Sequence, residues 1–169
     1  MTPPSPSSGV DAALFRQLLG RFATGVTVVT TRRADGARVG MTASSIASVS
    51  LDPPLLLVSI DLRNEMHDAL RAARRFVVNV LAADQEAISR RFASAEEHRF
   101  DRETGIGFTD NAEGLPVLDG VLAHIECTKV QAAPAGDHTV FFGLVTGGAV
   151  TDRRPLLYYR GGYTGLEGS

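Results

Sequence analysis

Apolar residues recur every three or four positions in two stretches of the chain, the spacing of a helix with one buried face. Residues 11–20 and 63–74 show this spacing. The apolar positions are Leu14, Phe15, Leu18 and Leu19 in the first stretch, and Met66, Ala69, Leu70 and Ala73 in the second. Asp84 is placed to cap a third helix, and Ser94 with Glu97 has the spacing of a capping box for a fourth. We therefore predict a few short helices.

The remaining apolar segments are typical of β-strands. Two segments rich in β-branched residues flank Asp35-Gly36, a dipeptide that favours a hairpin turn. Between residues 121 and 128 apolar and polar positions alternate, as in a half-buried antiparallel strand. Further strands are expected at 55–60, 76–81, 139–146 and 155–160, with Gly147-Gly148 loosening the chain after the third of these. About six or seven strands with few helices favour a closed or nearly closed antiparallel barrel.

One segment is rich in small and hydroxylic residues. It is GMTASSIASVS, residues 40–50, which we expect to be a strand that ends before Pro53-Pro54. Its small residues, Gly40, Ala43, Ser44 and Ala47, would let a flat ligand approach the backbone. The amides and hydroxyls of Thr42, Ser44 and Ser45 would meet a polar ring edge. Arg63 and Asn64 stand where the next helix should begin, a place suited to a phosphate. An ordinary strand with one wet face remains the alternative.

Composition and charge narrow the class of protein. The 169 residues fit one domain, which we place at 11–169, after a Pro- and Ser-rich tail at 1–10 that we expect to be disordered. The net charge of −2, from 17 basic and 19 acidic residues, disfavours a nucleic-acid or membrane-surface role. No apolar run approaches the ~20 residues of a membrane helix, and no secretory pattern opens the chain. We expect a cytoplasmic protein.

Familiar catalytic motifs are missing from the sequence. It contains no Walker loop, dinucleotide fingerprint, HExxH or GxSxG motif. Its single cysteine excludes a cysteine-based zinc site, and its four histidines show no metal-ligand spacing. We therefore expect no metal centre.

Several segments together resemble the flavin reductase-like family. They are FATGVTVVTT, GMTASSIASVSLDPPLLLVSI, FVVNVL, LDGVLAHIEC, AGDHTVFFGLV and PLLYYRGGY, and the resemblance covers residues 11–164. It implies an FMN-binding split β-barrel that forms a homodimer. It also implies an enzyme that uses NADH or NADPH to reduce FMN or FAD, and a partner monooxygenase that receives the reduced flavin. Two other functions remain open: a non-catalytic flavin-binding or electron-transfer module, and a barrel used only for protein interaction.

The resemblance also assigns roles to individual residues. It implies that the TASS segment and Ser59 contact the flavin, and that the GDH loop places His138 beside the nicotinamide as an assisting catalytic residue. The implied cofactor-binding residues are Thr42, Ala43, Ser44, Ser45, Ser59, Arg63, Asn64, His67, Gly136 and Asp137. The family's phosphate-binding Ser-x-Thr pair is replaced here by Asn64 and Met66, and methionine has no hydroxyl to donate. His67 is expected either at the phosphate or on an exposed helix surface.

Overall fold

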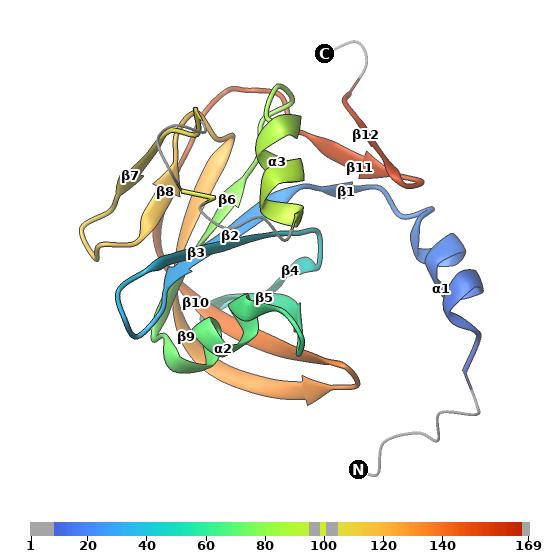
Figure 1. Ribbon diagram of the computed structural model, residues 1–169, viewed down its shortest axis with the longest axis horizontal. Helices are drawn as coiled ribbons and strands as arrows, with labels where there is room; N and C mark the ends of the chain where they lie inside the picture. The colour runs from blue at the N-terminus through green and yellow to red at the C-terminus, as the bar shows by residue number, and fades with distance from the viewer. Residues whose placement is uncertain (1–8, 95–98, 101–104, 167–169) are drawn as a thin grey trace.

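The fold of the chain is mainly β. The structure, a computed structural model, describes residues 9–94, 99–100 and 105–166, and Figure 1 shows its three helices and three sheets. Nearly all of the predicted tail lies outside the described residues, as does Glu97 of the predicted capping box. None of the described helices is long and apolar enough to cross a membrane. Within the same ranges, no cluster of His, Cys, Asp and Glu could hold a metal ion.

The helices and strands follow one another in a fixed order along the chain. The helices are α1 (Ala12–Leu19), α2 (Glu65–Ala72) and α3 (Glu86–Ala93). The first strands are β1 (Thr24–Gly25), β2 (Thr27–Arg32), β3 (Arg38–Ala43), β4 (Ile46–Leu51), β5 (Pro54–Asp61) and β6 (Arg75–Val80). The later strands are β7 (Phe108–Asp110), β8 (Pro116–Leu118), β9 (Ala123–Ala135), β10 (His138–Val150), β11 (Leu157–Tyr159) and β12 (Gly162–Thr164). The strands expected at 55–60, 76–81 and 139–146 are confirmed, and so is the strand at 121–128, although β9 and β10 are much longer than expected. The strand expected at 155–160 is reduced to the three residues of β11.

Seven strands form the main sheet, and all neighbours in it are antiparallel. Their order is β3-β2-β6-β9-β10-β5-β4, so β3 and β4 are its two edges. These edge strands are nevertheless consecutive in the chain, joined only by Ser44 and Ser45. Because three residue steps span at most about 10 Å, the two edges must approach each other at this link. The prediction of one continuous strand over residues 40–50 is wrong, since the hydroxyl-rich segment changes strand partners at Ser44-Ser45.

A hydrophobic core joins α2 to the main sheet. Met66, Ala69 and Leu70 are buried in it, as their predicted common face requires. Ala73 does not share that helical face, because its backbone is extended and ends the helix. The ammonium group of Lys129 in β9 then donates to the carbonyls of Leu70 and Arg71, at 2.6 and 2.7 Å. A cation at the negative end of the helix dipole stabilises α2 where it meets the sheet.

The capping prediction for α3 is wrong. Gln85, rather than Asp84, occupies the position before the helix, and it makes no side-chain cap. Its side-chain oxygen accepts instead from the N–H of Ala82, at 2.9 Å. Asp84 pairs with Arg153, which comes from a distant part of the chain. A tertiary ion pair has therefore replaced the local cap.

A buried polar network holds the two-stranded sheet β7–β8 against the main sheet. Asn79 in β6 has no exposed surface. Its amide donates to the carbonyl of Val28 (3.0 Å) and the hydroxyl of Thr30 (3.1 Å), while its oxygen accepts from the N–H of Leu118 (2.9 Å). The Thr30 hydroxyl in turn donates to the carbonyl of Pro116, at 2.6 Å. The Asn79 oxygen thus holds β8, while its nitrogen binds β2, from which Thr30 reaches β8 as well.

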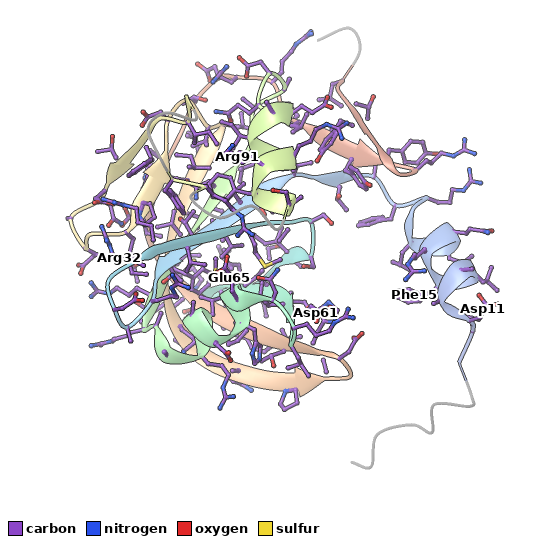
Figure 2. All side chains as sticks on the ribbon, in the orientation of Figure 1. Asp11, Phe15, Arg32, Asp61, Glu65 and Arg91 are labelled. Atoms are coloured by element: carbon purple, nitrogen blue, oxygen red, sulfur yellow. The ribbon has the colours of Figure 1, made fainter. Side chains whose placement is uncertain are left out.

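The predicted first helix is present, but its apolar face is not buried within the chain. Asp11 caps α1 by accepting from the N–H of Leu14, at 2.8 Å. None of the helix residues is buried, and Figure 2 shows Phe15 on a helix that stands apart from the sheets. The exposed apolar side chains of this segment are Val10, Leu14, Phe15, Leu18, Leu19 and Phe22. We refer to these six residues as the α1 stripe.

Candidate functional site

The Ser44-Ser45 link is small, polar and exposed. The Ser45 hydroxyl donates to the carbonyl of Ser59 in β5 (2.8 Å), and the N–H of Ser59 donates to the carbonyl of Ser45 (3.0 Å). The structure thus brings these two predicted site residues together. Among the described residues, neither the hydroxyl nor the N–H of Ser44 has a hydrogen-bond partner. Ser44 therefore presents a hydroxyl and an amide donor that are free to meet the polar edge of a ligand.

The residues just before the link are occupied by hydrogen bonds and packing contacts within the protein. The Thr42 hydroxyl donates to the carbonyl of Ser89 in α3, at 2.7 Å. Ala43 is buried in the core, and its carbonyl accepts from the hydroxyl of Thr27, at 2.6 Å. A Cβ on Gly40 would lie 2.7 Å from the ring of Phe92. The small size of Gly40 and Ala43 is thus needed for packing, which corrects the expectation that both leave room for a ligand.

An ion pair lies where β5 leads into α2. The Asp61 carboxylate accepts from the N–H, Nε and Nη2 of Arg63, at 2.8, 3.1 and 2.7 Å. These hydrogen bonds hold the pKa of Asp61 well below its usual range. Figure 2 shows Asp61 at the end of β5, just before α2. Sequence reasoning missed Asp61, although its position two residues before Arg63, at a strand end, was a signal for such a pair.

The GDH segment forms the tight turn between β9 and β10. Gly136 adopts a positive φ of 65°, which glycine tolerates without strain. The carbonyl of Asp137 accepts from the N–H of Leu62 at 3.0 Å, and His138 pairs with Asp61 in the register of β10 and β5. Nδ1 of His138 lies 2.8 Å from the Asp137 carboxylate, and this hydrogen bond lowers the pKa of Asp137. The predicted GDH residues therefore lie next to the entry of α2.

The start of α2 differs from the sequence-based expectation in two respects. Asn64 caps the helix, because its side-chain oxygen accepts from the N–H of Met66 at 2.9 Å. Its NH₂ group has no acceptor within the described part of the chain. Met66 is fully buried in the core. His67 is only 6% exposed, so the expectation of an exposed helix surface is wrong. Its Nε2 lies 3.0 Å from the hydroxyl of Thr139, which ties α2 to β10.

One strand connects the two groups of predicted site residues. Ser59 and Asp61 occupy alternate positions of β5 and therefore point to the same face of the sheet. Ser59 is bonded to the Ser44-Ser45 link, while Asp61 is bonded to Arg63 and lies opposite His138. The result is a continuous polar strip of small donors, a hydrogen-bonded ion pair and a histidine. Such a strip is suited to binding and orienting a ligand with a polar edge.

A cavity of about 330 Å³ lies beside the start of β7 and the end of β8, and none of the predicted site residues lines it. Its lining residues are Gly105, Ile106, Gly107, Phe108 and Asp119.

Comparisons with known proteins agree with one another. The profile of the flavin reductase like domain matches residues 19–167. The chain is 41% identical to the reductase subunit HsaB of a flavin-dependent monooxygenase from Rhodococcus jostii, over 95% of this chain and 81% of the relative. It is 44% identical to an NADH-dependent flavin reductase from a Rhodococcus species, over 90% and 85%.

Solved structures show the same likeness. An NADH:FAD oxidoreductase from Streptomyces globisporus, in complex with NAD and FAD fragments, superposes with a TM-score of 0.86. It shares 36% identity, over 97% of this chain and 96% of that one. An oxidoreductase from Sinorhizobium meliloti gives a TM-score of 0.87 at 39% identity, over 92% of this chain, which spans only 53% of that longer protein.

Proposed function

The chain belongs to the flavin reductase like domain family, and from this membership we propose that it is an NADH-dependent flavin reductase that supplies reduced flavin to a partner monooxygenase. The observation that carries the proposal to this chain's own residues is the Ser44-Ser45 link. It joins the two edges of the main sheet, and no described residue bonds the amide or the hydroxyl of Ser44. Free donors on a small exposed segment fit the polar edge of a flavin ring.

Each predicted site residue has a place in this proposal. Ser44 and Ser45 meet the ring edge, and Thr42, Ala43 and Ser59 hold that link through the hydrogen bonds described above. Arg63 and the free NH₂ group of Asn64 hold the flavin phosphate at the start of α2, where the helix dipole favours an anion. His67 fixes that helix against β10. Gly136 and Asp137 shape the turn that presents His138.

The protein's contribution to the reaction is placement. NADH supplies a hydride that the flavin ring accepts, so the two ligands carry the chemistry. A productive approach needs reacting atoms about 3 to 3.5 Å apart, which makes orientation the main task of the binding residues. His138 sits in a turn pinned by the Leu62–Asp137 hydrogen bond, and its Nδ1 is engaged by Asp137. That arrangement leaves Nε2 to contact the nicotinamide.

The proposed activity is tested by mixing the protein with NADH and excess FMN or FAD in air. We expect NADH oxidation well above the rate without protein, and dependent on added flavin. No turnover with either flavin, when NADH and NADPH are both tried, would reject the proposal.

Replacing His138 with alanine is expected to slow NADH oxidation by up to about a hundredfold, the size of effect that follows from misplacing a reacting group. Flavin affinity should change much less, because the ring-edge donors are on Ser44 and Ser45. Steady-state rates and flavin binding measured on the same preparation separate the two effects. His124→Ala is the matched control, since this histidine lies on β9 outside the proposed site. An equal loss of flavin affinity and rate in His138→Ala would contradict the assigned role.

The proposal extends to fold and assembly. An FMN-binding split β-barrel is supported by the two-residue link between the edge strands, and we place it at residues 11–169. A homodimer is supported by the α1 stripe. A helix of eight residues is marginal in water on its own, so α1 needs a surface that covers its apolar side chains. A second copy of this chain is that surface in our proposal.

Phe15→Glu is expected to shift the protein from dimer to monomer, because it places a charge at the centre of the α1 stripe. Sedimentation or light scattering over a range of protein concentrations measures the effect. Gln17→Glu adds the same charge to the same helix outside the stripe and should leave the dimer intact. A wild-type protein that is monomeric at all concentrations would refute the dimer.

A further inference from the structure

We propose that Tyr158 and Tyr163, with Arg90, form a stacking platform for the adenine ring of an adenosine diphosphate group, the part that FAD and NADH share and FMN lacks. We call these three residues the tyrosine platform. The inference rests on the proposed function, because it concerns the second half of a dinucleotide whose first half lies at the Ser44-Ser45 link.

The platform is built by strand pairing. β11 and β12 are antiparallel, and their register places Tyr158 directly opposite Tyr163, so both rings lie on one face of the small sheet. The ring centroids are 5.3 Å apart with an interplanar angle of 70°, an edge-to-face contact. The Arg90 guanidinium of α3 lies over the Tyr163 ring, 4.9 Å from its centroid. Tyr158 remains 38% exposed, so this ring is available for contact.

A hydrogen-bonded chain connects the platform to the proposed flavin site. The hydroxyl of Tyr163 lies 2.8 Å from that of Ser89, a residue of α3 with no exposed surface. The carbonyl of Ser89 accepts from the hydroxyl of Thr42, at 2.7 Å. Thr42 is two residues before Ser44. Two hydrogen bonds through Ser89 therefore connect the platform to the strand that leads into the proposed ring site.

The chemistry of the platform suits a nucleotide base. Adenine is flat, and stacking on an aromatic side chain adds about 1–3 kcal/mol per base. The ion pair between Arg90 and Glu86 neutralises the charge of Arg90, so this residue contributes a planar, polarised surface.

The neighbouring tyrosine provides a matched control. Tyr159 follows Tyr158 in β11, so its side chain points to the opposite face of the sheet. It is 40% exposed, nearly the same fraction as Tyr158. A variant at Tyr159 thus removes the same ring from the same strand without touching the platform.

The first test is calorimetric titration with ADP, which contains adenine and diphosphate but no flavin or nicotinamide. We expect saturable binding to the wild type, about tenfold weaker binding to Tyr158→Ala, and unchanged binding to Tyr158→Phe and Tyr159→Ala. Absence of ADP binding in the wild type, or equal loss in Tyr158→Ala and Tyr159→Ala, would overturn the platform.

The second test identifies the source of the adenine. If the base belongs to FAD, Tyr158→Ala weakens FAD binding about tenfold and leaves FMN binding and the KM for NADH unchanged. If the base belongs to NADH, the variant raises the KM for NADH with FMN as the flavin and leaves FAD binding unchanged. An equal loss of FMN and FAD affinity would overturn the inference. Failure of the proposed function would appear differently, as a wild type that binds neither flavin.

Discussion

Ser44→Trp is expected to abolish flavin binding, lowering the affinity for FMN and FAD by about a hundredfold or more while the domain still folds. The position tolerates a large side chain because Ser44 is exposed and lies outside regular strands. The indole would occupy the space that the flavin ring needs and would remove the free hydroxyl. Flavin binding is measured by fluorescence titration, and folding by circular dichroism and thermal unfolding.

The control for this prediction adds the same side chain elsewhere. Ala112 is exposed in the turn between β7 and β8, away from every residue of the proposed site. Ala112→Trp should bind flavin like the wild type. A folded Ser44→Trp variant with wild-type affinity would show that the flavin does not lie at the Ser44-Ser45 link.

Asn79→Leu is expected to lower the free energy of unfolding by about 3 kcal/mol. The substitution leaves the buried N–H of Leu118 without its acceptor. It also removes the donor to the carbonyl of Val28 and to the hydroxyl of Thr30, although Thr30 keeps its bond to Pro116. Burying an unsatisfied donor or acceptor costs about 1–3 kcal/mol for each group. Denaturant titration measures the change in the free energy of unfolding. The comparison requires that this free energy depend on denaturant concentration with the same slope in the variant and the wild type.

Gln131→Leu is the matched control for the network. It also replaces a side-chain amide with leucine, but at an exposed position of β9. The Gln131 amide has no partner among the described residues. Its effect should stay within about 0.5 kcal/mol. Equal stabilities of the Asn79 and Gln131 variants would mean that the Asn79 hydrogen bonds do not stabilise the fold.

The regular elements were predictable because their periodicity is local. The strand at 76–81, the hairpin turn at Asp35-Gly36 and the apolar face of α2 were each predicted and each found. Element ends were less accurate, because pairing with distant residues sets them. β9 and β10 extend each other well beyond their apolar runs, since one long antiparallel ladder satisfies both backbones.

The sequence named candidate site residues, but it did not report the contacts between them. The grouping of Ser45 with Ser59, and of Arg63 with the GDH turn, arises from the fold, which no spacing in the sequence reports. Hydroxyl-rich residues are compatible with both strand and link, so the break at Ser44-Ser45 was missed. The burial of His67 was missed for a similar reason: its partner, Thr139, is 72 residues away.

Anaerobic titration of free flavin with NADH, in the presence of a small amount of this protein, tests the central claim most directly. The bleaching of oxidised flavin counts how many flavin molecules each protein molecule reduces. A reductase that releases its product should bleach many equivalents of FMN or FAD per protein, as our account predicts. Bleaching of no more than one equivalent would indicate a flavin carrier or electron-transfer module instead, and would contradict the account.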